Sequence, residues 1–399
     1  MAQCLDRIIA SMDTGVDDAL ALAYLLGSAD ECELSGVIAS YGNVDANTAY
    51  ANTHAVLDLF GRADIPVFLG SEHPSWADAF IPDAGCAQFH GDDGLGNTWL
   101  AGSGALADGA GVPGDMSGDD MSVDVPDGVV SVGGYLAGDV HAHPALGSYP
   151  RVGRSRSVDR PQSATSTALV SGGTRRCSVD AADGIEYLIE QVREFGRDVT
   201  VLSTGPLTDV DAAITRAPDI ASKLRLVMMG GTLTQPGNCW DAVAETNIIQ
   251  DPEAANRVFH SGADITMVGL DVTHQCLLTR SAADRWRATG TKRGRFLADL
   301  ADFSTKANLE ADTALFSGGM PLHDPLAAAV ALDSSLVDCF DLALRAETNT
   351  GDFNGVRGRT TGDPVGLVNH SMPHVHVALG VDSGRFLDEF AERMAEVCR

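Results

Sequence analysis

The stretch RIIASMDTGVDDALALAYLL, residues 7–26, contains the pattern that decides the fold. A short apolar run over residues 7–12 predicts a buried strand. After a turn, apolar residues recur at helical spacing over residues 17–26. A strand that leads directly into a helix is the repeating unit of a parallel sheet covered by helices.

The same alternation continues on both sides of a long irregular segment. We expect further strands at residues 34–39, 65–69, 199–203, 224–229, 264–270 and 374–379. We expect further helices at residues 46–60, 180–195, 209–217, 252–261, 281–307 with a break, 324–332 and 384–397. The sequence therefore predicts an α/β fold with an open, mostly parallel, Rossmann-like sheet and helices on both faces.

Residues 101–164 differ from the rest, because they are rich in Gly, Asp, Ser and Pro and show no periodicity. Some 60 residues without an element are unusual inside a compact domain, and they indicate an insertion. We expect a single domain over residues 1–399 that carries a flexible insertion at 101–164. A lid, an oligomer contact and a disordered loop are the alternatives for this segment.

The composition excludes several classes of protein. The 399 residues include 27 basic and 55 acidic ones, which gives a net charge of −28, and such a surface repels nucleic acid and anionic membranes. The hydrophobic fraction of 44% is sufficient for a large core. The acidic surface is either an ordinary solvated surface or that of an acidic proteome in a halophile with a high-salt cytoplasm.

The first residues and the spacing of the cysteines bear on where we expect the protein to be located. The first residues contain no signal-peptide pattern, and no apolar run reaches the roughly 20 residues of a membrane span. The eight cysteines form no CxxC pair, which indicates free thiols in a reducing compartment. We therefore expect a cytoplasmic protein that contacts no membrane.

Polar residues gather where the predicted strands end, which is the edge at which open parallel sheets bind ligands. Asp13, Asp17 and Asp18 follow the first strand, and His323 and Asp324 begin a later helix. Capping of a helix start is the simpler explanation for Asp17 and Asp18. Hard oxygen ligands in this number suit Ca²⁺ or Mg²⁺ rather than zinc.

Ten short motifs occur in an order that points to one family. They are DTGVDDA at 13–19, YGN at 41–43, HGDDGLG at 90–96, STGPLT at 203–208, MGG at 229–231, PGN at 236–238, AETN at 244–247, DPEAA at 251–255, MVGLDVTH at 267–274 and LHDP at 322–325. Together they resemble the nucleoside hydrolases, the inosine–uridine-preferring group, over about residues 5–100 and 180–397. The resemblance implies a nucleosidase of nucleoside salvage that hydrolyses the N-glycosidic bond of ribonucleosides.

The resemblance also implies a role for individual residues. The implied Ca²⁺ ligands are Asp13, Asp18, Asp324 and the backbone carbonyl of Thr204, with Asp13 also acting as the base for the attacking water. His323 and His90 correspond to histidines near the leaving base, His90 to one of pyrimidine-preferring members. The residues expected to bind the sugar are Asp17, Asn43, Met229, Asn238, Glu245 and Asn247. The family further implies a small-molecule nucleoside substrate and a homo-oligomer, either a dimer or a tetramer.

Two departures from the family pattern keep other hypotheses open. Ser11 replaces the Asp that usually stands two residues before the catalytic one, and the 237–247 loop, which contains Trp240, is one residue longer than usual. One alternative is therefore a non-catalytic nucleoside-binding or ribose-binding member. A Mg²⁺-dependent phosphohydrolase is less favoured, because its first strand-end Asp, the nucleophile, is Ser11 here.

Overall fold

A computed structural model describes residues 5–82, 84–98, 181–239, 243–350, 356–363 and 372–399. The predicted insertion at 101–164 lies outside the described residues, as does Trp240. The prediction of one domain with a flexible insertion therefore stays a prediction.

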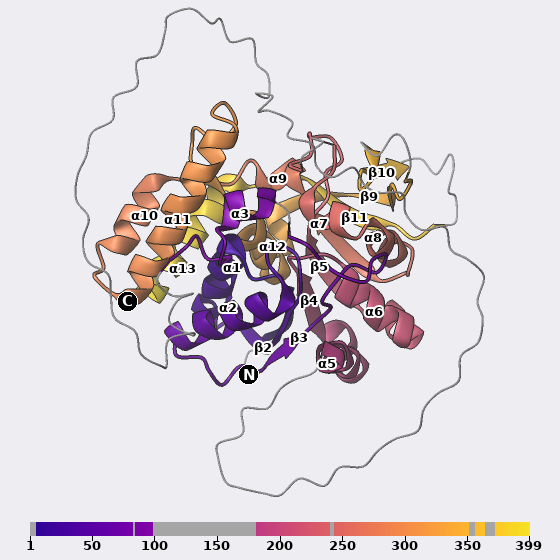
Figure 1. Cartoon of the computed structure of the whole chain (residues 1–399). Helices are drawn as coiled ribbons and strands as arrows, with labels where there is room; N and C mark the ends of the chain where they lie inside the picture. Colours follow the sequence, from indigo (N-terminus) through magenta and orange to yellow (C-terminus); the bar gives the residue numbers. More distant parts are fainter. Residues whose placement is uncertain (1–4, 83, 99–180, 240–242, 351–355, 364–371) are drawn as a thin grey trace, which may run out of the picture. The chain divides into compact units, whose positions relative to one another are not determined.

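The described part of the chain forms a nine-stranded sheet in the order β10-β9-β11-β6-β5-β4-β1-β2-β3 (Figure 1). Its strands are β1 (Asp6–Met12), β2 (Cys32–Ala39), β3 (Val67–Leu69), β4 (Val199–Ser203), β5 (Arg225–Met229), β6 (Asp264–Val268), β9 (Val337–Ala346), β10 (Thr360–Asp363) and β11 (Val375–Val381). Neighbouring strands pair in parallel from β11 to β3, whereas β9 is antiparallel to both β11 and β10. A two-stranded antiparallel sheet, β7 (Leu277–Leu278) and β8 (Met320–Pro321), lies apart from it.

Helices cover both faces of the large sheet. They are α1 (Val16–Gly27), α2 (Ala46–Leu59), α3 (Ala84–His90), α5 (Ala181–Phe195), α6 (Thr208–Arg216), α7 (Thr246–Gln250), α8 (Pro252–Phe259), α9 (Leu270–Thr273), α10 (Arg280–Arg287), α11 (Lys292–Ala311), α12 (His323–Leu332) and α13 (Ser383–Val397). In the described chain, no helix is long and apolar enough to cross a membrane.

Strand β1 shows why the core has two halves. Ile8, Ala10 and Met12 belong to one buried cluster, which contains side chains of α1, α2 and α10 to α13. Ile9 points to the opposite face and joins a second cluster with α5, α6 and α8. Because both faces are covered, the strand reads as a continuous apolar run, and the predicted α/β fold is confirmed.

Most predicted elements are present, with changes at some ends. The strand expected at 264–270 ends at Val268, since Gly269 is the N-cap of the short helix α9. The break predicted within 281–307 lies between α10 and α11, where Gly290 has a φ of +72°. Glycine adopts this left-handed conformation without steric cost, so it allows the chain to turn between the helices. The edge strands β9 and β10 were not predicted.

Candidate active site

Four carboxylates meet where β1 ends and where α1 and α12 begin. Asp13 follows β1 directly, Asp17 and Asp18 lie in the first turn of α1, and Asp324 lies in the first turn of α12. Helices α1 and α12 pack against each other, which brings Asp324 to the other three (Figure 1). Asp17, Asp18 and Asp324 each offer one oxygen within 4.8 Å of the others' oxygens.

Burial and mutual repulsion make this cluster unfavourable without a cation. Asp13 and Asp18 are fully buried, and Asp324 is only 3% exposed. Desolvation and the neighbouring carboxylates hold the pKa values of Asp13 and Asp324 well above the usual range. Burial raises the pKa of Asp17 to about 6. Carboxylates that are this close favour a cation that neutralises them.

Unpartnered oxygens support the same conclusion. In the described structure, Oδ1 of Asp13 and Oδ1 of Asp17 are buried and accept no hydrogen bond. Buried polar atoms without partners are rare in native proteins, and a site for a bound ion is one of their explanations. Hard carboxylate oxygens are the ligands that Ca²⁺ and Mg²⁺ prefer. The residues present therefore fit a divalent cation, and Asp17 belongs to the cluster along with the predicted ligands.

The remaining atoms of the cluster are held by hydrogen bonds. The hydroxyl of Thr204, just after β4, donates to Oδ1 of Asp18 over 2.6 Å. Oδ2 of Asp18 accepts from the backbone N–H of Gly15 over 2.8 Å, so Asp18 also caps α1. Oδ2 of Asp13 accepts from the backbone N–H of Asn43 over 2.7 Å. These bonds leave Oδ1 of Asp13 as the oxygen available to a ligand or a proton.

A second group of predicted residues joins the cluster through Thr204. The amide of Asn247 donates to the Thr204 carbonyl over 2.7 Å and to the Met229 carbonyl over 3.2 Å. Glu245, which is buried, caps α7 by accepting the N–H groups of Asn247 and Ile248, and it also accepts that of Gly231. These hydrogen bonds therefore connect the ends of β4 and β5 with α7, next to the carboxylates.

Asn238 lies at the outer end of the same region. It is exposed, and its side-chain oxygen accepts from the backbone N–H and the hydroxyl of Thr246 at the start of α7. Asn238 is therefore connected to the α7 group, whereas no direct bond links it to the carboxylates in the described structure.

Two predicted histidines lie close to the cluster. Nδ1 of His90 accepts from the backbone N–H of Val16 over 3.2 Å and lies 3.8 Å from Oδ1 of Asp17. Nδ1 of His323 is 2.8 Å from the hydroxyl of Thr273. Burial lowers the pKa of His90 to about 4, and burial together with neighbouring histidines lowers that of His323 well below its usual range. Both imidazoles are therefore neutral at pH 7.

His274 lies next to His323. The two ring centroids are 5.6 Å apart, and His274 also makes an edge contact with Phe316 at 5.5 Å. Its Nε2 is buried, and it neither accepts nor donates a hydrogen bond among the described residues. His274 and Phe316 thus add an aromatic wall to the side on which His323 lies.

Sequence reasoning missed one polar contact at this edge of the sheet. The hydroxyl of Ser11 donates to Oδ2 of Asp209 over 2.9 Å, and both side chains are buried. The residues are 198 positions apart. No pattern in the sequence connects them, because the contact forms only when the tertiary fold brings the start of α6 close to the end of β1.

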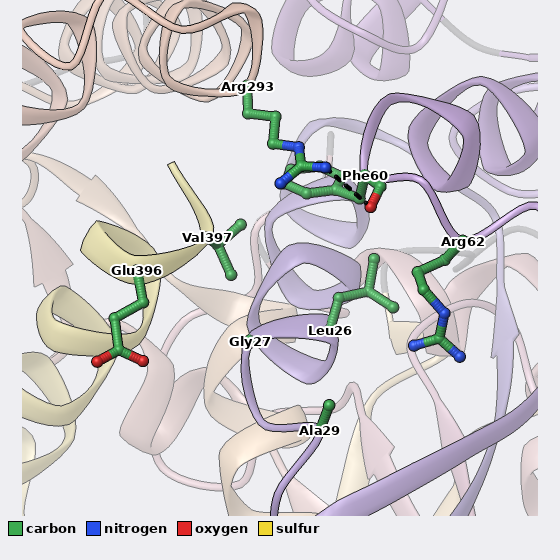
Figure 2. Close-up of a pocket in the computed structure, with 8 residues that line it drawn as sticks. All are labelled: Leu26, Gly27, Ala29, Phe60, Arg62, Arg293, Glu396 and Val397. Atoms are coloured by element: carbon green, nitrogen blue, oxygen red, sulfur yellow. Dashed lines mark hydrogen bonds between the residues drawn. The ribbon is translucent and has the colours of Figure 1, made fainter. Parts of the chain in front are cut away.

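A surface cavity of about 340 Å³ lies elsewhere, between the end of α1, the end of α2 and α13 (Figure 2). It is lined by Leu26, Gly27, Ala29, Phe60, Arg62, Arg293, Glu396 and Val397. None of the predicted site residues lines it, and the Arg293 guanidinium is bonded to the carbonyls of Leu59 and Phe60. The carboxylate cluster, and not this cavity, is therefore the candidate active site.

Comparison with known proteins identifies the family. The family model for inosine-uridine preferring nucleoside hydrolase matches residues 8–388. The chain belongs to the inosine-uridine preferring nucleoside hydrolase family. It is similar to the pyrimidine-specific ribonucleoside hydrolase RihA of Enterobacter sp. (strain 638), with 30% identity over 390 residues, 98% of this chain and 97% of that one.

Solved structures of nucleoside hydrolases have the same fold. A purine-preferring ribonucleoside hydrolase from Gardnerella vaginalis matches with a TM-score of 0.73 and 34% identity, over 98% of this chain and 99% of that one. The plant nucleoside hydrolase PpNRh1 matches with a TM-score of 0.72 and 26% identity, over 98% and 99%. The resemblance drawn from the motifs is confirmed, and the chain is an N-ribosyl hydrolase.

Proposed function

We propose that this nucleoside hydrolase cleaves the N-ribosidic bond of ribonucleosides at the carboxylate cluster, with Asp13 as general base. The observation that supports the proposal is the state of Asp13, which is fully buried with Oδ2 fixed by Asn43 and Oδ1 unpartnered. A general base needs one oriented oxygen within hydrogen-bond reach of the proton that it removes.

The cation in this proposal is Ca²⁺, held by Asp13, Asp18, Asp324 and the carbonyl of Thr204. When bound, Ca²⁺ supplies positive charge that offsets the carboxylates and coordinates sugar hydroxyls. Asp17, which lies within the cluster and has a free oxygen, accepts hydrogen bonds from the ribose hydroxyls. The carboxylates thereby fix the ring beside Asp13 and lower the entropic cost of reaction.

The proposed bond changes balance as a hydrolysis. A water oxygen forms a bond to the anomeric carbon, the carbon–nitrogen bond breaks, and its electron pair leaves with the nucleobase. Oδ1 of Asp13 takes one proton of the water, and the nucleobase nitrogen that leaves with the electron pair takes up a proton from solvent, so the products are ribose and the neutral nucleobase. The sugar carries positive charge in this transition state, as in glycoside hydrolysis, and Asp17 and the buried Glu245 stabilise that charge.

The histidines act on the leaving base in this proposal. Because His90 and His323 are neutral, each offers one N–H to a nucleobase rather than a positive charge. The hydroxyl of Thr273 occupies Nδ1 of His323, so Nε2 is the atom that faces the base. Asn43, Met229, Asn238 and Asn247 complete the proposed sugar site.

One experiment tests the proposal directly. The purified protein is incubated with a panel of purine and pyrimidine nucleosides, with Ca²⁺ or with chelator, and free ribose is measured. We expect ribose release that depends on Ca²⁺ and falls by at least about 10³-fold in Asp13→Ala. The exposed Asp58→Asn variant is the matched control and keeps full activity. Calorimetric binding of a nucleoside without ribose release would identify a non-catalytic member instead.

The panel also decides the preferred nucleobase, because the names of similar proteins differ. One is described as pyrimidine-specific and another as purine-preferring. A homodimer or homotetramer, a cytoplasmic location and a role in nucleoside salvage are further parts of the proposal. Light scattering of the purified protein tests the oligomeric state.

A further inference from the structure

Asp209 is a fully buried carboxylate that the proposed mechanism does not use. It lies in the first turn of α6 (Thr208–Arg216), at the edge of the sheet where β1 ends. Its two oxygens accept from the hydroxyl of Ser11 over 2.9 Å and from the backbone N–H of Ser71 over 2.6 Å. Burial of a carboxylate costs free energy unless the group is hydrogen-bonded, and Asp209 receives its hydrogen bonds from two segments that are distant in sequence.

The backbone fits closely around Asp209. A side chain at Gly70 would bring its Cβ within 2.4 Å of Oδ2 of Asp209. Glycine is therefore required for the loop after β3 to reach the carboxylate, and the next residue, Ser71, supplies the N–H donor. Asp209 connects this loop to β1, although the two segments are far apart in sequence.

Two short routes lead from Asp209 to the proposed active site. The first passes through Ser11, which lies two residues before Asp13 and whose carbonyl accepts from the N–H of Thr204 over 3.0 Å. It therefore holds the β1 end against the β4 end. Both ends contribute to the carboxylate cluster, because Asp13 follows one and Thr204 the other.

The second route passes through Ser71. Its carbonyl accepts from the N–H of Tyr41 over 3.1 Å, and two residues later the N–H of Asn43 donates to Oδ2 of Asp13 over 2.7 Å. That donation is the bond that orients Asp13. The loop that carries Asn43 is thus anchored through Ser71 to Asp209.

We propose that Asp209 is a positioning residue that fixes the orientation of Asp13 through Ser11 and Ser71. The inference rests on the proposed function of Asp13. It also gives Ser11 a role. Ser11 replaces the Asp of the family pattern, and its hydroxyl hydrogen-bonds Asp209, a carboxylate of α6.

The test compares Asp209→Ala with Asp209→Asn in the full-length protein with Ca²⁺. Asparagine keeps both bonds, since its oxygen accepts from the Ser71 N–H and its amide donates to the Ser11 hydroxyl. We expect kcat to fall on the order of 10²-fold in Asp209→Ala and to stay within about threefold of the parent in Asp209→Asn. Asp211→Ala is the matched control, because Asp211 is buried on the same helix but pairs with Arg257.

A second measurement does not depend on activity. Hydrogen exchange at the Asn43 amide, in chelator, is expected to be about tenfold faster in Asp209→Ala than in Asp209→Asn or Asp211→Ala. Should Asp209→Ala not fold, Ser11→Ala replaces it, with an expected several-fold loss of kcat and faster exchange at Asn43.

The outcomes separate the two proposals. A parent that releases no ribose rejects the proposed function, whereas exchange at Asn43 still tests the positioning role. Parent-like kcat and exchange in Asp209→Ala, or in its substitute Ser11→Ala, overturn the inference. An equal loss of kcat in Asp211→Ala also overturns it, because the effect would then be general destabilisation of α6.

Discussion

Removing one charge from the carboxylate cluster should stabilise the protein without metal and weaken its response to metal. The change is Asp17→Asn, which keeps the shape of the side chain. Burial raises the pKa of Asp17 from 3.8 to about 6. At about 1.4 kcal/mol for each pKa unit, keeping Asp17 ionised in the folded state costs about 3 kcal/mol.

The sign of the pH dependence follows from the same values. Below pH 3.8 the carboxyl is protonated in the folded and unfolded states, so the cost is absent. It develops as pH rises from 3.8 to about 6, because the unfolded state ionises first, and it is complete above that range. In chelator, the parent should therefore lose stability over this interval, and Asp17→Asn should lose about 3 kcal/mol less.

The expected shift in melting temperature can be calculated. An unfolding entropy of about 2.1 cal/mol/K per residue over 399 residues gives roughly 0.8 kcal/mol/K. A gain of about 3 kcal/mol therefore raises Tm by about 4 °C at pH 7.5 in chelator. With Ca²⁺ at about 1,000 times its Kd, the free energy of unfolding of the parent rises by about 4 kcal/mol, and that of Asp17→Asn rises by less.

Scanning calorimetry with Ca²⁺ and with chelator measures both effects. Exposed Asp58→Asn serves as the control and should leave both melting temperatures unchanged. If Asp17→Asn melts at or below the parent in chelator while the control is unchanged, the argument that burial of the ionised Asp17 destabilises the folded state is wrong.

Three further predictions concern backbone packing, a histidine contact and the surface charge. In Gly42→Ala the added Cβ would lie 1.9 Å from Oδ2 of Asp13; we expect ribose release to fall on the order of 10²-fold. Gly384→Ala is the active control, because Gly384 is exposed and the nearest heavy atom to its added Cβ is 3.9 Å away. Thr273→Val removes the 2.8 Å contact with Nδ1 of His323 and should lower kcat by about tenfold with Tm within about 2 °C of the parent; an unchanged kcat would remove His323 from the proposed mechanism. Because the net charge is −28, molar KCl should raise Tm by screening self-repulsion, and a lower Tm would contradict the high-salt hypothesis.

The sequence by itself determined the strand–helix unit at residues 7–26 and the parallel sheet built from it. Local patterns suffice there, because a strand covered on both faces is apolar throughout and its helix shows apolar residues at regular spacing. It also placed Asp13, Asp17 and Asp18 together, since they lie within six residues at one strand end. The family motifs supplied the remaining site residues.

Only the tertiary structure decided the antiparallel edge of the sheet. Strand β9 has four consecutive exposed residues and no alternation, so its sequence does not read as a strand until it pairs with β11. Helix α7 has five residues, too few to show a period. Long-range pairing, rather than local propensity, stabilises such elements.

The tertiary structure also decided what surrounds each functional group. Thr204 bonds Asp18 across 186 positions and Ser11 bonds Asp209 across 198, contacts that no local spacing encodes. Burial also holds His90 and His323 neutral, which their residue type alone does not determine. The residue type determines which chemical group a side chain carries. Its charge state and its hydrogen-bond partners depend on the distant segments that pack around it and exclude water.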